Sequence, residues 1–129
     1  MAEKLTLEID PKALRMIVAG GRDFDDYGRM SKILNTFLEK VENKVIVTGE
    51  YPTGADALAK VYAEENNIDH VGFEADWTNL GDAAGPIRNS QMAQYGHALI
   101  AFWDMKSPGT DSMIKQARKV GIPIMIIVY

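Results

Sequence analysis

Three glycine-containing segments of the sequence have the composition of anion-binding turns. The segment Ala19–Phe24 places Arg22 directly after a glycine pair, Thr48–Asp56 contains two further glycines, and Trp103–Asp111 contains a Ser-Pro-Gly-Thr run that can open a helix. Glycines let backbone N–H groups approach a ligand closely, and a helix N-terminus attracts negative charge. Because no Gly-Lys-Ser/Thr follows the first turn, the segments predict a phosphate site that is not a Walker loop.

Two aspartates near these turns each have two interpretations. Thr53 and Asp56 have capping-box spacing at the start of an expected helix, so Asp56 either stabilises the helix N-terminus or contacts a ligand. Asp104 ends an apolar segment, where an unpaired carboxylate is unfavourable. Asp104 therefore belongs either to a pocket or to a solvated turn.

The segment Asp76–Met92 is the part of the chain that folding alone explains least. Arg88 and Asn89 follow Ile87 directly, so the expected helix is polar on several sides. Such a helix either faces solvent or lines a wet site. The aromatic ring of Trp77 can stack on a base or cover the edge of the core.

Other residues capable of chemistry are expected to have structural roles. His70 and His97 lack companions at metal-ligand spacing, and Asp23, Asp25 and Asp26 are expected to precede and cap a helix rather than to hold an ion. The chain has no cysteine, which excludes thiolate metal sites and cysteine nucleophiles, and no Gly-x-Ser-x-Gly motif indicates a serine hydrolase. We therefore expect neither a metal nor a cofactor.

Length and charge narrow the choice of partners. The 129 residues correspond to one domain, and 14 Lys and Arg against 18 Asp and Glu give a net charge of −4. This sign disfavours binding to nucleic acid or to anionic membranes. The longest apolar run, Ile122–Tyr129, is far shorter than the ~20 residues of a membrane span, and the charged N-terminus does not resemble a signal peptide. We expect a soluble, unprocessed, cytoplasmic protein.

Short apolar segments rich in β-branched residues alternate with segments of helical periodicity. Continuously apolar strands are typical of a parallel sheet covered on both faces, and the alternation predicts an α/β fold, a Rossmann-like three-layer α/β/α sandwich with a mostly parallel sheet of about five strands. Asn66–Asn67 and Gly121 are expected to end two of the helices. The apolar helix stripes can form a homodimer interface as well as a core. The expected strands span residues 15–19, 44–48, 69–74, 97–103 and 123–129.

The predicted fold brings the three turns together. We expect a single domain over residues 1–129, with residues 1–12 as a lead-in or a short edge strand over 5–9. In open α/β sheets ligands bind outside the carboxyl ends of the strands. The turns that follow the strands are therefore expected to form one site.

Taken together and in order, these segments resemble the YspA/YpsA-related branch of the SLOG superfamily, Rossmann-like proteins that include the LOG phosphoribohydrolases and the DprA/Smf proteins. The resemblance spans roughly residues 14–129 and implies a protein that binds a nucleotide or nucleotide-derived ligand, as a sensor or as an N-glycosidase acting on nucleoside monophosphates. With the patterns above, it gives as candidate ligand-binding residues Gly20, Gly21, Arg22, Thr48, Gly49, Gly54, Asp56, Trp77, Asn89, Ser107, Gly109 and Thr110.

The resemblance also implies a set of candidate catalytic residues. In the LOG enzymes an arginine and a glutamate cooperate to cleave the N-glycosidic bond, and Arg88 matches that arginine. The LOG motif Pro-Gly-Gly-x-Gly-Thr-x-Glu has its glutamate where this chain has Ser112, so Asp104 or Asp111 would have to supply the carboxylate. A carboxylate moved by one helical residue points about 100° away. The resemblance therefore implies ligand binding more directly than it implies hydrolysis.

Two other functions are compatible with the sequence. A nucleoside deoxyribosyltransferase-like enzyme would need a carboxylate nucleophile, for which Glu50 and Glu74 are the candidates near strand ends. A DprA-like protein that binds single-stranded nucleic acid would need a basic groove with aromatic platforms. The basic residues of this chain are instead dispersed among more numerous acidic ones.

Overall fold

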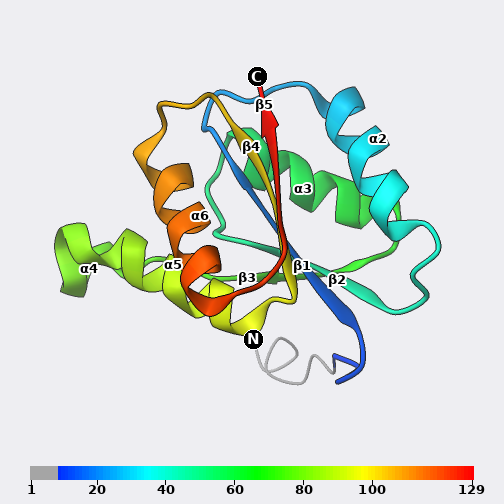
Figure 1. Ribbon diagram of the computed structural model, residues 1–129, viewed down its shortest axis with the longest axis horizontal. Coiled ribbons are helices and arrows are strands. Elements are labelled where there is room, and N and C mark those ends of the chain that lie inside the picture. Colours follow the sequence, from blue (N-terminus) through cyan, green and yellow to red (C-terminus); the bar gives the residue numbers. More distant parts are fainter. Residues whose placement is uncertain (1–8) are drawn as a thin grey trace.

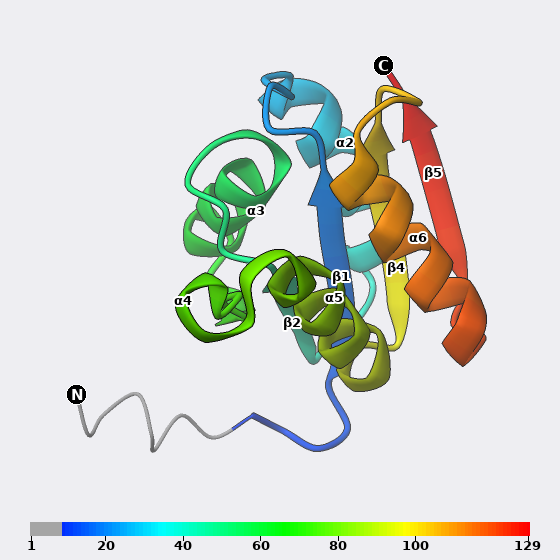
Figure 2. The same ribbon diagram turned by 90° about the vertical axis from the view of Figure 1, so that its left-hand side faces the viewer.

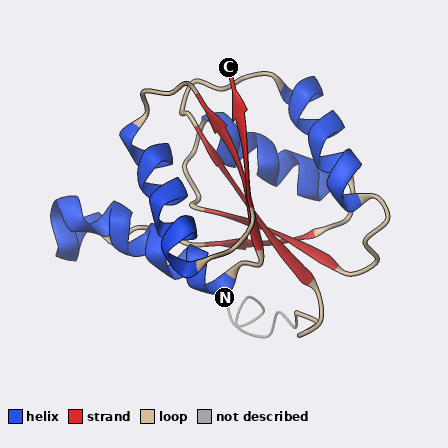
Figure 3. Cartoon of the chain, viewed as in Figure 1, coloured by secondary structure: helices blue, strands red, loops and turns tan. Residues whose placement is uncertain are grey.

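Five strands form a single parallel sheet in the order β3-β2-β1-β4-β5 (Figures 1 and 3). The computed structural model describes residues 9–129. The order of strands and helices along the chain confirms the predicted Rossmann-like α/β/α sandwich. The strands are β1 (Leu14–Gly20), β2 (Lys44–Thr48), β3 (Asp69–Gly72), β4 (Ala98–Trp103) and β5 (Ile124–Val128).

Helices cover both faces of the sheet. Figure 1 shows α2 and α3 on one face and α5 and α6 on the other, and in Figure 2 α5 and α6 lie side by side in front of the strands. The short α4 projects away from the sheet (Figure 1). The helical segments are α2 (Tyr27–Leu38), α3 (Gly54–Glu65), α4 (Trp77–Leu80), the 3₁₀ turn η1 (Gly81–Ala83), α5 (Ala84–Tyr95) and α6 (Pro108–Val120).

The central strand β1 packs against both helix layers. Met16 and Val18 belong to the cluster that contains the buried residues of α2 and α3, whereas Ile17 and Ala19 belong to the cluster that contains those of α5 and α6. Ile17 and Val18 are fully buried. Burial on both faces explains why the strand is continuously apolar rather than alternating.

The helix ends follow the sequence signals in most cases. The side chain of Asp26 accepts a hydrogen bond from the N–H of Arg29 at 3.0 Å and caps α2, as predicted. Asn67, with φ of 53°, follows the end of α3, and Gly121, with φ of 94°, ends α6. A left-handed residue after the last turn is the usual way to end a helix.

The structure differs from two expectations, the short N-terminal edge strand and a single polar helix after β3. Residues 9–13 form turns rather than a strand, and residues 5–8 of the expected edge strand lie outside the described residues. The polar segment after β3 is divided into α4, η1 and α5 at Gly81, whose φ of 56° interrupts the helix. Within residues 9–129, no helix is both long enough and apolar enough to span a membrane.

Candidate functional site

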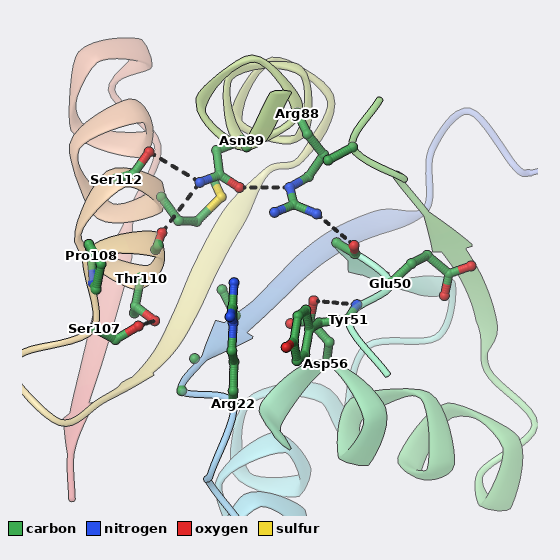
Figure 4. A pocket seen from close by; sticks show the side chains of 18 of the residues that line it. Arg22, Glu50, Tyr51, Asp56, Arg88, Asn89, Ser107, Pro108, Thr110 and Ser112 are labelled. Carbon is green, nitrogen blue, oxygen red and sulfur yellow. Dashed lines mark hydrogen bonds between the residues drawn. The ribbon is translucent and has the colours of Figure 1, made fainter. Parts of the chain in front are cut away.

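The carboxyl ends of the strands surround a cavity of about 840 Å³ (Figure 4). It is lined by the segments that follow β1, β2, β3 and β4, together with the first turns of α5 and α6. From β1 the chain adds β2 and β3 on one side of the sheet and then β4 and β5 on the other, so the topological switch point lies between β1 and β4. Ligands of open α/β sheets bind at such a point. The volume is within the range of small-molecule sites.

Most of the candidate residues from the sequence lie around this cavity. Three candidates do not line the cavity: Thr48, which is fully buried at the end of β2, Gly54, in the first turn of α3, and Asp111, on α6. The candidates that line the cavity are Gly20, Gly21, Arg22, Gly49, Asp56, Trp77, Arg88, Asn89, Asp104, Ser107, Gly109 and Thr110.

The first turn of α6 presents backbone N–H groups to the cavity. Ser107 precedes the helix, Pro108 is its first residue, and the buried Thr110 donates a hydrogen bond from Oγ1 to Ser107 Oγ at 3.3 Å. Gly109 faces open space, because a Cβ at this position would meet no atom within 4 Å. The N–H groups of Gly109 and Thr110 have no intrahelical acceptor, as is general for a first helical turn. This turn can therefore donate hydrogen bonds to an anion.

Arg88 and Asn89 connect the loop after β2 with the first turn of α6. Arg88 Nη1 donates to the carbonyl of Gly49 at 2.6 Å, and its Nε donates to Asn89 Oδ1 at 3.0 Å. Asn89 is only 4% exposed, and its Nδ2 donates to the Gly109 carbonyl at 3.3 Å and to Ser112 Oγ at 3.2 Å. Figure 4 shows this chain of bonds across the top of the cavity. The polar helix α5 thus lines the cavity with its polar side chains.

The guanidinium group of Arg88 packs directly against Gly49. A Cβ on Gly49 would lie 2.6 Å from Arg88 Nη1 and 2.9 Å from Cζ. Burial lowers the pKa of Arg88, Asp56 opposes this shift, and Arg22 adds to it because the two guanidinium groups repel. Two cations therefore face the same space.

Arg22 lies over an aromatic ring instead of against a carboxylate. Its Cζ is 4.4 Å from the centroid of the Tyr51 ring (Figure 4), a cation–π arrangement. Thr53 Oγ1 donates to the carbonyl of Arg22 at 2.9 Å, and Ala55 N–H donates to the carbonyl of Gly21 at 3.1 Å. The loop after β2 thus holds the loop after β1 in place.

The glycine pair after β1 has a different role from the predicted one. The N–H of Gly21 donates to the carbonyl of Phe102 at 3.0 Å, so it is not available to an anion. A Cβ on Gly20 would overlap Phe102 and Ala55, and a Cβ on Gly21 would overlap the hydroxyl of Tyr129. Close packing therefore accounts for both glycines.

The predicted capping box at the start of α3 is wrong. Thr53 occupies the N-cap position but makes no side-chain cap, because its hydroxyl is bonded to Arg22. Asp56 Oδ2 instead accepts the N–H of Tyr51 at 3.1 Å. Burial raises the pKa of Asp56 to about 6, although the Tyr51 N–H and Arg88 act in the opposite direction. This carboxyl group can exchange a proton near neutral pH.

Asp104 and Asp111, the two candidate catalytic aspartates, have different surroundings. Asp104 Oδ1 accepts the N–H groups of Lys106 at 2.8 Å and of Ser107 at 2.7 Å, and these bonds lower its pKa. The prediction for Asp111 is not supported, because it points out of the cavity and pairs with Lys115 at 2.9 Å. The neighbouring Ser112 lines the cavity instead, as the rotation of about 100° per helical residue requires.

Of the two candidate transferase nucleophiles, Glu74 lines the cavity, whereas Glu50 is engaged with other side chains. Glu50, with φ of 61°, lies 3.7 Å from Lys60 and 3.9 Å from His70. Figure 4 shows its side chain directed away from Arg22 and Arg88. Thr48 Oγ1 is 2.8 Å from His70 Nε2, and neither residue lines the cavity. Within residues 9–129, no three His, Asp or Glu side chains come together as a metal site.

Sequence reasoning missed Tyr51 as a cavity residue. Its contacts with Arg22 and, through its N–H, with Asp56 join residues from two loops. The available signal was an aromatic residue in the loop after a strand, but its partner Arg22 is 29 positions away in the chain. Trp77, 53% exposed, lines the cavity and packs against Gly85.

Comparisons with known proteins agree with this fold. The structure is similar to DNA processing protein A (DprA) from Streptococcus pneumoniae, with a TM-score of 0.71 and 18% identity over 89% of this chain; it spans 50% of the DprA chain. The Moco carrier protein from Chlamydomonas reinhardtii gives a TM-score of 0.66 and 19% identity, over 90% of this chain and 76% of that chain. The molybdenum cofactor binding protein from Rippkaea orientalis gives 0.67 and 17%, over 91% and 77%. No curated protein matches the chain in sequence.

The sequence itself shows the family. The model of the YspA, cpYpsA-related SLOG family matches residues 14–79, slightly more than half of the chain. The matched part runs from β1 into α4 and includes the loops that carry Arg22, Gly49 and Asp56. The chain therefore belongs to the YspA, cpYpsA-related SLOG family.

Proposed function

We propose that the chain binds a nucleotide or nucleotide-derived ligand in the cavity at the carboxyl ends of the strands, with a phosphate group between Arg22, Arg88 and the first turn of α6. One observation carries the proposal. Both guanidinium groups face the cavity, and neither has a carboxylate within 4.0 Å among the described residues. An arginine that has no carboxylate partner, next to free helix N–H groups, is suited to a phosphate.

The rest of the ligand extends toward Trp77. The exposed indole ring lines the cavity from the start of α4, a different element from the Ser107–Thr110 turn. An aromatic face of this kind stacks well on a planar base. The proteins named for carrying or binding the molybdenum cofactor have the same fold and also take a small ligand, which supports a small-molecule function here.

Hydrolysis of the N-glycosidic bond of a nucleoside monophosphate is a second candidate function. Asp56, with its pKa raised to about 6, is the cavity group suited to proton transfer, and the ionised Asp104 can stabilise positive charge on a sugar. Arg88 would orient the ligand. Ser112 stands where the LOG enzymes have glutamate, and we therefore rank binding before hydrolysis.

The charges of the cavity lining disfavour DprA-like binding of single-stranded nucleic acid. Two cationic side chains line the cavity, against five acidic ones: Asp23, Glu50, Asp56, Glu74 and Asp104. A groove that follows a polyanionic backbone needs the opposite balance.

Isothermal titration calorimetry tests the proposal. Nucleoside mono-, di- and triphosphates, ADP-ribose and a short single-stranded DNA are titrated into the wild type and Arg22→Gln. Arg22 is exposed, so its replacement is expected to leave the fold intact. The matched control is Arg29→Gln, an exposed arginine on α2 outside the cavity. We expect a phosphorylated ligand whose affinity falls about 10-fold or more in Arg22→Gln only. Binding of no phosphorylated ligand, or equal loss in both variants, would overturn the proposal.

For the second candidate, release of free base from a bound nucleoside monophosphate is measured in the wild type and Asp56→Asn.

A further inference from the structure

The charges around the cavity set a limit on the ligand, and this inference rests on the proposed function. Arg22 and Arg88 supply two positive charges, and the first turn of α6 adds the partial charge of a helix N-terminus. A single phosphate group with two negative charges balances them. Each further negative charge meets a cavity wall whose remaining ionisable side chains are all acidic.

Asp104 is the acid that is fixed beside the phosphate position. Its Oδ1 is held by the N–H groups of Lys106 and Ser107, at 2.8 and 2.7 Å, and Ser107 is the residue before the first turn of α6. No Lys or Arg within residues 9–129 lies within 4.0 Å of its carboxylate. Its negative charge is therefore not held in an ion pair, although Lys106 acts on it from further away.

Three of the other acids of the lining have partners away from the first turn of α6. Asp23 Oδ1 accepts the hydroxyl of Tyr129 at 2.6 Å, Glu50 lies against Lys60 and His70, and Asp56 accepts the N–H of Tyr51. Glu74, the fourth, lines the cavity from the segment between β3 and α4. Asp104 alone is bonded to the backbone that leads into the first turn of α6.

We propose that Asp104 is a specificity-determining residue that limits the site to ligands with one phosphate group and rejects diphosphates and polyphosphates. The limit is electrostatic: a second phosphate group next to the first would lie against a fixed carboxylate. Like charges held close together in a binding site disfavour the wrong ligand more than they affect the right one.

Asp104→Asn removes the charge and keeps the turn, because the amide oxygen of asparagine can accept the same two N–H groups. The control Asp69→Asn removes one charge from an exposed position at the amino end of β3. Inorganic phosphate and pyrophosphate are titrated at one ionic strength, with binding followed by the NMR shifts of backbone amides. Thermal unfolding of both variants checks that they remain folded.

In the wild type and in Asp69→Asn we expect pyrophosphate to bind about 10-fold more weakly than phosphate, and in Asp104→Asn we expect the two affinities to be within about 3-fold. Pyrophosphate binding as tightly as phosphate in the wild type would overturn the inference while leaving the proposed function intact. An Asp104→Asn protein in which both affinities rise equally would also overturn it. If neither anion binds the wild type, the proposed function and this inference both fail.

Discussion

Replacing Gly109 with aspartate is expected to stabilise the fold while removing phosphate binding. Gly109 is the second residue of α6, its φ is not left-handed, and a Cβ there meets no atom within 4 Å. A carboxylate in a first helical turn stabilises by about 0.3–1 kcal/mol, and removing a helical glycine adds about 0.5 kcal/mol. Repulsion from Asp104 offsets part of this gain. We expect a net gain of about 0.5–1 kcal/mol, or a rise in Tm of roughly 2–5 °C for a domain of this size.

The same carboxylate would take the position of the ligand phosphate at the N–H groups of α6. The affinity for a phosphate ester should therefore fall at least about 10-fold, which corresponds to about 1.4 kcal/mol. Calorimetry with AMP and thermal unfolding without ligand measure the two effects. Gly109→Asn has the same size without the charge, so it should bind AMP more tightly than Gly109→Asp. A Gly109→Asp protein that is more stable and binds AMP like the wild type would refute the placement of the phosphate at α6.

Three further predictions concern the loops that hold the cavity. Tyr51→Leu should weaken phosphate-ester binding about 2–5-fold, because Arg22 loses the ring 4.4 Å below it, and Tyr51→Phe should restore wild-type affinity in the same titration. The pKa of Asp56 is about 6 in the folded state against 3.8 in the unfolded chain, so the protein should lose stability as pH rises from about 4 through 6. In urea unfolding, Asp56→Asn should be more stable than the wild type by about 1–3 kcal/mol at pH 8 and equally stable at pH 4. A gain of equal size at both pH values would contradict the assignment. Gly54→Ala should destabilise by about 2 kcal/mol or more in urea, because φ is 73° and the new Cβ would overlap the carbonyl of Gly21, whereas Gly109→Ala should be tolerated.

The sheet was predictable because its strands are buried on both faces. The apolar character of β1, β2, β4 and β5 is continuous, and the two strands that were predicted two residues too long, β3 and β5, are the edge strands of the sheet. Left-handed residues such as Gly121 were also visible as helix ends. These signals are local, so they do not depend on tertiary contacts.

The convergence of the turns followed from the fold, but their internal contacts did not. Gly21 N–H is bonded to Phe102, and Thr53 is bonded to Arg22, and both partners are far away in the chain. The sequence pattern at Thr53 was that of a helix cap, and a tertiary hydrogen bond replaced the local one. Competition of this kind cannot be read from spacing alone.

Catalytic residues were the least predictable part of the site. Asp111 and Ser112 are adjacent in sequence, but the helix directs Ser112 into the cavity and Asp111 toward Lys115. The raised pKa of Asp56 depends on burial that only the folded chain supplies. The sequence therefore predicted most of the residues that line the cavity but did not rank its acids.

An NMR titration of the wild type with AMP tests the central claim most directly. The account predicts saturable shifts of the amide signals of Gly109 and Thr110, with smaller shifts around Arg22 and Gly49 and none at the amino ends of the strands. Absence of shifts at the first turn of α6, or saturable shifts centred away from the cavity, would contradict it.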